Sequence, residues 1–221
     1  MEPLKITIHL RTRMKAPNVP IQFDDLVAAM AVREAREQGR ENPLEALDEL
    51  PLEWVSQGGE RIWKASQMHL VPGGDVQMRQ RIRRTDYAEG VERFRAVGAG
   101  KIPNHTPGTG PFKDYQLLAP DQFFPRAEAW CIGDRERLTV LLESLRYVGK
   151  ERKNGLGRVA SIEIEPDQTA LDGWCWRPLG EQRPGYVPVA MPPSPPYWNR
   201  ARNRLMYAPL EGPESVMGGA S

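Results

Sequence analysis

Residues 149–158 read GKERKNGLGR and join a helix-periodic segment to an alternating segment that reads RVASIEIE. Its three glycines permit positive φ angles and close approach of another backbone, and two lysines and two arginines surround them. Successive amides in such a turn can form a concavity that binds anions. The sequence therefore predicts a loop that contacts a phosphate backbone. The candidate contact residues are Gly149, Lys150, Arg152, Lys153, Asn154, Gly155, Gly157 and Arg158.

The elements around this loop exclude two mononucleotide-binding motifs. Residues 155–160 read GLGRVA and fit G-x-G-x-x-A, but the dinucleotide fingerprint needs a strand before it and a helix after it. That order is reversed here. A P-loop is excluded because no Gly-Lys-Ser/Thr follows the turn. The plainer alternative is a loop that only ends a helix, with Gly149 as its C′ residue.

The composition favours one domain with an elaboration. A chain of 221 residues with 40% hydrophobic content can bury one core, while its 21 prolines and 20 glycines predict much irregular structure. No apolar run is long enough for a membrane span, and Cys131 and Cys175 have neither disulfide nor metal-ligand spacing. We expect a cytoplasmic protein with no cofactor, metal or membrane partner.

Hydrophobic periodicity predicts an α+β fold. The chain shows strand patterns and helix patterns in the order strand, helix, strand, insertion, strand, helix, strand. These segments are residues 4–11, a helix starting at Asp24 or Asp25 and ending near residue 38, then 62–71, 125–131, 134–148 and 158–165. This is the β-α-β-β-α-β order of the ferredoxin-like fold. The helices would cover one face of the sheet and leave the other as a binding platform.

Residues 1–170 would form this domain, with an insertion at residues 72–119 that carries a projecting hairpin and a loop. Residues 171–221 would form a Trp/Pro/Arg-rich extension whose last ten residues are frayed.

The predicted hairpin strand at residues 76–84 has an arginine face. Arg79, Arg81 and Arg83 project to one side, about 6.5 to 7 Å apart, which approximates the phosphate spacing of an extended single strand. The alternatives are a solvated outer face or protection of a sheet edge. The further candidate contacts to the phosphate backbone are Arg84, Arg11, Arg13 and Lys101, together with His105.

The second basic segment outside the loop lies in the extension and interleaves aromatic residues with arginines. Its candidate residues are Tyr197, Trp198, Arg200, Arg202 and Arg204. Tyrosine, tryptophan and arginine dominate interface hot spots, so a protein partner is the first interpretation, and base stacking is the alternative.

Evidence for catalysis is thin. His105 could act as a general acid or base in RNA cleavage, although a stray loop histidine explains it more simply. Asp24 and Asp25 could pair on a metal, but capping of the following helix is the simpler interpretation.

The loop and the opening of the chain together resemble the RAMP superfamily, the ferredoxin-like RNA-binding subunits of CRISPR effector complexes. The helix–GKERKNGLGR–strand segment is similar to the glycine-rich loop of that superfamily, and residues 6–29 (ITIHLRTRMKAPNVPIQFDDLVAA) look like its first strand and helix start. The likeness covers residues 1 to about 165. Within the superfamily the chain looks most like the Cas5-like, handle-binding subunit of type IV systems.

The resemblance implies a non-catalytic subunit that grips the 5′ handle of the CRISPR RNA and caps the backbone filament. It would help to sense the motif that flanks the DNA target. Its partners would be CRISPR RNA, backbone (Cas7-like) and large or small subunits, and target DNA. Two alternatives stay open: a metal-independent CRISPR repeat endoribonuclease, and a protein-interaction subunit that does not contact RNA directly.

Overall fold

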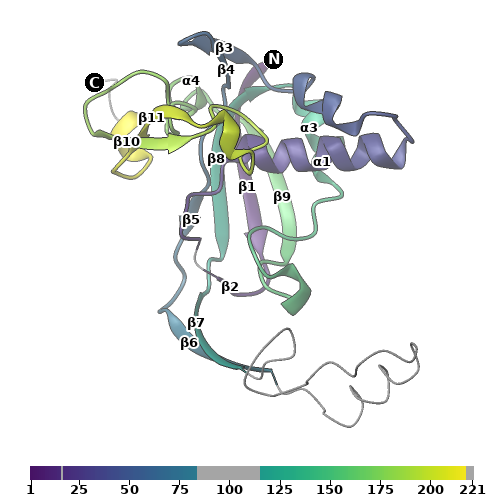
Figure 1. Cartoon of the computed structure of the whole chain (residues 1–221), viewed down its shortest axis with the longest axis vertical. Helices are drawn as coiled ribbons and strands as arrows, with labels where there is room; N and C mark the ends of the chain where they lie inside the picture. The colour runs from purple at the N-terminus through teal and green to yellow at the C-terminus, as the bar shows by residue number, and fades with distance from the viewer. Residues whose placement is uncertain (16, 84–114, 218–221) are drawn as a thin grey trace, which may run out of the picture. The chain divides into compact units, whose positions relative to one another are not determined.

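The computed structural model describes residues 1–15, 17–83 and 115–217 of the chain (Figure 1). The chain divides into two compact units, one formed by Met1–Asp75 with Gln122–Ser221 and the other by Val76–Asp121. Each unit is described by itself below. No helix in the described part of the chain is long and apolar enough to cross a membrane.

A four-stranded antiparallel sheet forms the centre of the larger unit, in the order β5–β8–β1–β9 (Figure 1). Its strands are β1 (Glu2–Leu10), β5 (His69–Val71), β8 (Arg126–Gly133) and β9 (Val159–Pro166). Helix α1 (Phe23–Glu37) lies between β1 and β5 in the chain, and α3 (Arg135–Leu142) lies between β8 and β9. These six elements give the β-α-β-β-α-β order. The predicted α+β, ferredoxin-like fold is therefore confirmed.

The main core lies between this sheet and the two helices. Alternate side chains of a strand point to the same face, and Leu4, Ile6 and Ile8 of β1 are fully buried against α1 and α3. Burial of each such side chain contributes about 1.5 to 3 kcal/mol. The alternation read in the sequence is thus what fixes the inward face of β1.

The opposite face of the sheet is partly covered by the C-terminal segment. The short helix α4 (Ala170–Gly173) packs against β8 and β1. Trp130 of β8 meets Trp176 edge to face, with ring centroids 6.4 Å apart, and both rings are buried. An aromatic pair of this kind adds about 0.5 to 1.5 kcal/mol beyond its buried area.

Polar side chains of neighbouring strands lie close together elsewhere on that face. Lys5 Nζ lies 3.2 Å from a carboxylate oxygen of Glu128, and His9 Nε2 lies 3.2 Å from one of Glu163. Arg126 also pairs with Glu128. The predicted platform is thus partly covered: α4 and Trp176 occupy one end of the face, and ion pairs of Glu128 with Lys5 and Arg126 lie elsewhere on it.

The C-terminal residues build a second small core with a hairpin from the middle of the chain. Strands β10 (Tyr186–Met191) and β11 (Arg204–Pro209) pair antiparallel, as do β3 (Trp54–Gln57) and β4 (Glu60–Trp63). Their shared core contains Ile62, Leu179 and Met206, all almost inaccessible. Where the sequence predicted an extension with a frayed end, the structure places these strands and α5 (Glu214–Met217) in the larger unit.

Two predicted segment boundaries differ from the structure. The strand predicted at residues 62–71 is split between β4 and β5, and β4 pairs with β3 across Gly58 and Gly59, whose φ angles are +60° and +80°. Two central residues with positive φ are typical of a two-residue hairpin turn. The predicted helix at residues 134–148 ends at Leu142, although Leu145 and Val148 stay buried beyond it and so preserve the helix-like apolar spacing.

Helix α1 is not capped as predicted. It begins at Phe23 after Gln22, and no side chain caps it. Asp24 therefore lies inside the first turn, fully buried. Helix α3, by contrast, has a side-chain cap, because Asp134 accepts a hydrogen bond from the amide of Arg137 at 3.0 Å.

In the smaller unit, β6 (Gln77–Arg83) pairs antiparallel with β7 (Tyr115–Gln122). Strand β6 matches the predicted strand at residues 76–84. The remaining short elements in the described part of the chain are β2 (Met14–Lys15), η1 (Pro43–Asp48), η2 (Arg152–Asn154) and η3 (Arg200–Arg202).

Candidate nucleic-acid interface

The glycine loop has a backbone that requires its glycines. Gly149, Gly155 and Gly157 have φ angles of +83°, +73° and +67°, a region that side-chain-bearing residues avoid. A Cβ at Gly157 would lie 2.0 Å from the carbonyl oxygen of Val148, whereas one at Gly155 would meet open space. Gly149 lies well beyond the end of α3, so it is not the C′ residue of that helix.

The loop is fastened to the segment that follows β1. The amide of Gly157 donates to the carbonyl of Arg13 at 2.9 Å, and the amide of Arg11 donates to the carbonyl of Arg158 at 2.8 Å. Between them, the hydroxyl of Thr12 accepts from the amide of Arg158 and donates to the carbonyl of Gly155. These bonds join two sequence segments that lie more than 140 residues apart.

This joining brings together the six predicted RNA-binding cations of the larger unit. Four cations of the loop are exposed, as is Arg11, while Arg13 is half-buried and donates to the carbonyl of Asp75 at 2.9 Å. The four loop cations are Lys150, Arg152, Lys153 and Arg158. We call these six residues the basic surface.

One acidic residue interrupts the basic surface. Glu151 has a positive φ of +66° and pairs with Lys15 at 3.4 Å. It also accepts a hydrogen bond from the side chain of Asn154 at 3.3 Å. No role for Glu151 follows from the sequence alone, although its position between two cations is visible there. The structure assigns it to holding the loop against β2.

The loop presents side-chain cations more than backbone donors. The amides of Asn154 and Gly155 donate within the loop, to the carbonyls of Glu151 and Arg152, and those of Gly157 and Arg158 also have internal acceptors. The predicted cradle of amides is therefore not available at these four positions. Contact with phosphates would depend on the lysine and arginine side chains.

In the smaller unit, Arg79 projects from β6 with 52% of its side chain exposed and pairs with the buried carboxylate of Asp121 at 3.1 Å. The carboxylate of Asp121 therefore partly neutralises the charge of Arg79 within the hairpin. Arg81 and Arg83 fall on the same strand, at alternate positions, and their contact with phosphates stays a prediction. The predicted contacts Arg84, Lys101 and His105 lie outside the described residues.

A buried polar cluster that the sequence did not reveal ties the C-terminal segment to α1. Arg177 is 1% exposed, and its guanidinium lies 3.1 Å from the carboxylate of Asp24. The guanidinium also donates to the hydroxyl of Tyr197 at 2.6 Å and to the carbonyls of Trp63 and Ala65 at 2.6 and 2.9 Å. Spacing alone gives no signal for a contact across 153 residues.

Burial sets the protonation states in this cluster. Burial raises the pKa of Tyr197 well above its usual value, which keeps the proton on its hydroxyl. That hydroxyl donates to Asp24 at 2.9 Å while it accepts from Arg177. Burial likewise raises the pKa of Asp24, and the charge of Arg177 opposes that shift.

The other predicted partner-binding residues are distributed differently from Tyr197. Trp198 is 74% exposed, and Arg200 is exposed beside it. Arg202 donates to the carbonyl of Pro195 at 2.8 Å, and Arg204 pairs with Glu60 at 3.3 Å. Tyr197 thus contributes its hydroxyl to the interior, and Trp198 presents its ring to solvent. Partner contact at this surface stays a prediction.

The described histidines have structural contacts. The Nε2 of His9 lies 3.2 Å from a carboxylate oxygen of Glu163, and His69 packs edge to face on Trp176 with ring centroids 5.7 Å apart. Within residues 1–15, 17–83 and 115–217, no group of three or more His, Cys, Asp or Glu side chains could hold a metal ion.

The model of the family described as CRISPR type IV associated protein Csf3 matches residues 2–209. The chain belongs to this family. It is therefore a type IV CRISPR-associated subunit, and the match extends through the second small core and includes most of the C-terminal residues. A search of curated proteins finds no match.

Proposed function

We propose that this chain is a non-catalytic RNA-binding subunit of a type IV effector complex in the cytoplasm, and that its basic surface grips the 5′ handle of the CRISPR RNA. The observation that supports the proposal is the fastening of the glycine loop to residues 11–13, which gathers six cations around one obligatory glycine turn. The ferredoxin-like sheet supports membership of the RAMP superfamily as a Cas5-like member.

In such a complex the subunit caps one end of the backbone filament. The hairpin β6–β7 then serves as the thumb that meets the neighbouring backbone subunit and the RNA, and Trp198 with Arg200 contacts a protein partner. Target DNA near the flanking motif would be a further partner.

Salt dependence tests the RNA contact. Each phosphate that a cation neutralises on a single strand adds about −0.7 to the slope of log affinity against log salt. The triple variant Lys150→Gln, Arg152→Gln and Lys153→Gln should flatten the slope by about 2 units. At 0.1 M salt the same relation predicts a loss of about 100-fold in affinity for repeat RNA.

The matched control removes three other exposed arginines with the variants Arg33→Gln, Arg36→Gln and Arg40→Gln on and just after α1. It changes the net charge equally and should change the slope by less than about 0.5 units. Equal losses in both variants would mean that binding follows net charge only, and the basic surface would lose its assignment.

The same RNA decides between the competing functions on native and denaturing gels. A shifted, intact RNA that prefers the repeat handle over a scrambled sequence supports the proposal. Shortened RNA in the presence of EDTA would instead indicate a metal-independent endoribonuclease, which His105→Ala should then inactivate. If the repeat RNA is not shifted on the native gel even with the assembled complex, the remaining interpretation is a subunit that only contacts other proteins.

A further inference from the structure

Strand β9 forms one edge of the sheet in the larger unit. Seven of its eight residues pair with β1 on one side, with Ala160 at a register irregularity, and no named strand in the described part of the chain pairs with its other side. A strand edge presents unpaired N–H and C=O groups that can accept another strand. The first residue of this edge is already covered, because the amide of Val159 donates to the carbonyl of Arg146 at 2.9 Å. The stretch that can add one more strand therefore begins after Val159.

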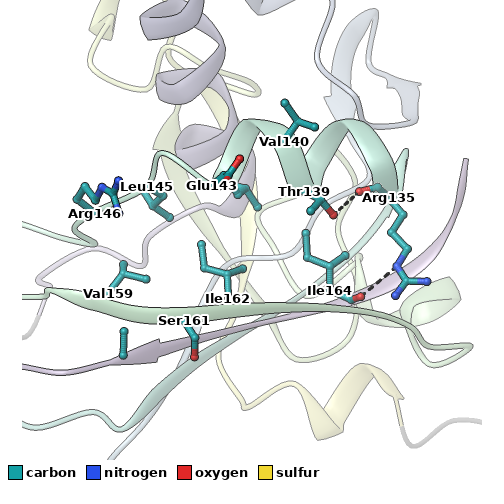
Figure 2. A pocket seen from close by; sticks show the side chains of 12 residues that line it. Arg135, Thr139, Val140, Glu143, Leu145, Arg146, Val159, Ser161, Ile162 and Ile164 are labelled. Atoms are coloured by element: carbon teal, nitrogen blue, oxygen red, sulfur yellow. Dashed lines mark hydrogen bonds between the residues drawn. The ribbon is translucent and has the colours of Figure 1, made fainter.

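The hydrogen bonds of β9 show which residues face this open edge. The Nε of Arg135 reaches from α3 to donate to the carbonyl of Ile164 at 3.2 Å (Figure 2), so that carbonyl points away from β1. Backbone groups two residues apart point to the same side of an antiparallel strand, and Ile162 therefore also faces the open edge. The residues between them, such as Glu163, turn their backbone groups toward β1.

A groove lies beside this edge, between β9 and α3, with a volume of about 550 Å³. Ile162 and Ile164 point from β9 toward the helix, while Ser161 points to the other face (Figure 2). Both isoleucines are only half-buried, although their partners Ile6 and Ile8 on β1 are fully buried. The inner face of the sheet is thus incomplete at this edge.

The opposite wall of the groove adds an exposed apolar side chain and a basic rim. Val140 of α3 is 59% exposed. Arg135 and Arg146 lie toward opposite ends of the groove with Glu143 between them (Figure 2), which leaves one net positive charge on the lining. An occupant with apolar side chains in the middle and a carboxylate near an end complements this pattern.

We propose that β9 accepts an extended segment of another protein subunit as a fifth strand of the sheet. The segment would have apolar residues at alternate positions, which fill the groove against Ile162 and Val140, and an acidic residue that reaches Arg135 or Arg146. Addition of a strand obtains affinity from backbone hydrogen bonds and specificity from pockets for alternate side chains. Nucleic acid fits less well, because no aromatic ring lies among the described residues that line the groove.

This inference rests on the proposed function only in assuming that the chain works within a multi-subunit complex. Amide hydrogen exchange with single-residue resolution tests it, on the isolated chain and on the complex assembled by co-expression with the other type IV subunits and a CRISPR RNA. The amides of Ile162 and Ile164 should become at least tenfold slower to exchange in the complex. The amide of Glu163, which faces β1, should change much less.

Two variants provide the matched comparison. Val140→Asp places a charge in the groove and should weaken retention of one partner subunit at least tenfold. Val19→Asp makes the same replacement at a valine that is 67% exposed outside the groove and should have no effect. The Val140→Asp chain should still bind repeat RNA, whereas the triple variant of the glycine loop should lose RNA and keep the exchange pattern at β9. The two proposals can therefore fail separately.

Several outcomes would overturn the strand-addition proposal. Unchanged exchange at Ile162 and Ile164 in the complex would show that no strand adds. Protection by RNA alone would assign the groove to RNA, and protection that follows self-association of the isolated chain would assign it to a second copy. Equal retention of every subunit by both valine variants would exclude the groove as a docking site.

Discussion

Replacement of Asp24 by Asn should destabilise the fold by about 3 to 5 kcal/mol. The two partners Asp24 and Arg177 are 0% and 1% exposed, and their charges are 3.1 Å apart. Removal of one partner leaves the other charge buried and uncompensated, which costs about 3 to 5 kcal/mol. The carbonyls of Trp63 and Ala65 remain as acceptors for the guanidinium, so a value near the lower limit is expected.

Urea unfolding followed by tryptophan fluorescence measures this change. In a chain of 221 residues, a loss of about 4 kcal/mol corresponds to a fall in Tm of roughly 8 to 16 °C. The surface variant Arg33→Gln, which breaks the exposed pair with Glu37, should cost less than about 0.5 kcal/mol. The double variant Asp24→Asn with Arg177→Met should be more stable than Asp24→Asn alone, because it removes the orphaned charge.

The reasoning fails if Asp24→Asn unfolds within about 1 kcal/mol of the parent chain. It fails equally if the double variant loses as much stability as the two single variants added together, since additivity would mean that the two groups do not interact.

Three further predictions concern the same unit. Burial, together with the neighbouring carboxylate of Asp24, raises the pKa of Asp25 to about 6. The folded state therefore holds this proton more tightly than the unfolded chain, and stability should fall as pH rises from about 4 to 6. Asp25→Asn should remove that fall from a pH series of urea-unfolding measurements, and an unchanged pH profile would contradict the raised pKa. Gly157→Ala should lower the stability by more than about 2 kcal/mol, because its Cβ would collide with Val148. Gly155→Ala, whose Cβ would meet open space, should cost only about 1 to 2 kcal/mol from its positive φ. Equal losses of stability in urea unfolding would show that the collision at Gly157 contributes nothing. Deletion of residues 168–221 should abolish cooperative thermal unfolding, because it removes the buried arginine and two of the three buried residues of each small core. A truncated chain with the parent Tm would show that the domain is independent of its extension.

The sequence by itself determined the elements that form the ferredoxin-like sheet. The alternation of Leu4, Ile6 and Ile8 specifies an inward strand face, because side chains on a strand repeat every two residues and burial of apolar surface selects that face. The glycines of the loop were informative for a related reason: positive φ is a local constraint, and Gly155 and Gly157 adopt it.

Only the tertiary structure decided what lies next to what. The hydroxyl of Thr12 bridges a loop more than 140 residues away, and Arg177 finds its counter-charge in Asp24 from the opposite end of the chain. Such contacts depend on how the whole chain packs, so neither periodicity nor spacing encodes them locally. For the same reason the sequence could show the cations of the loop, but only the fold could unite them with Arg11 and Arg13 in one surface and leave β9 as an open edge.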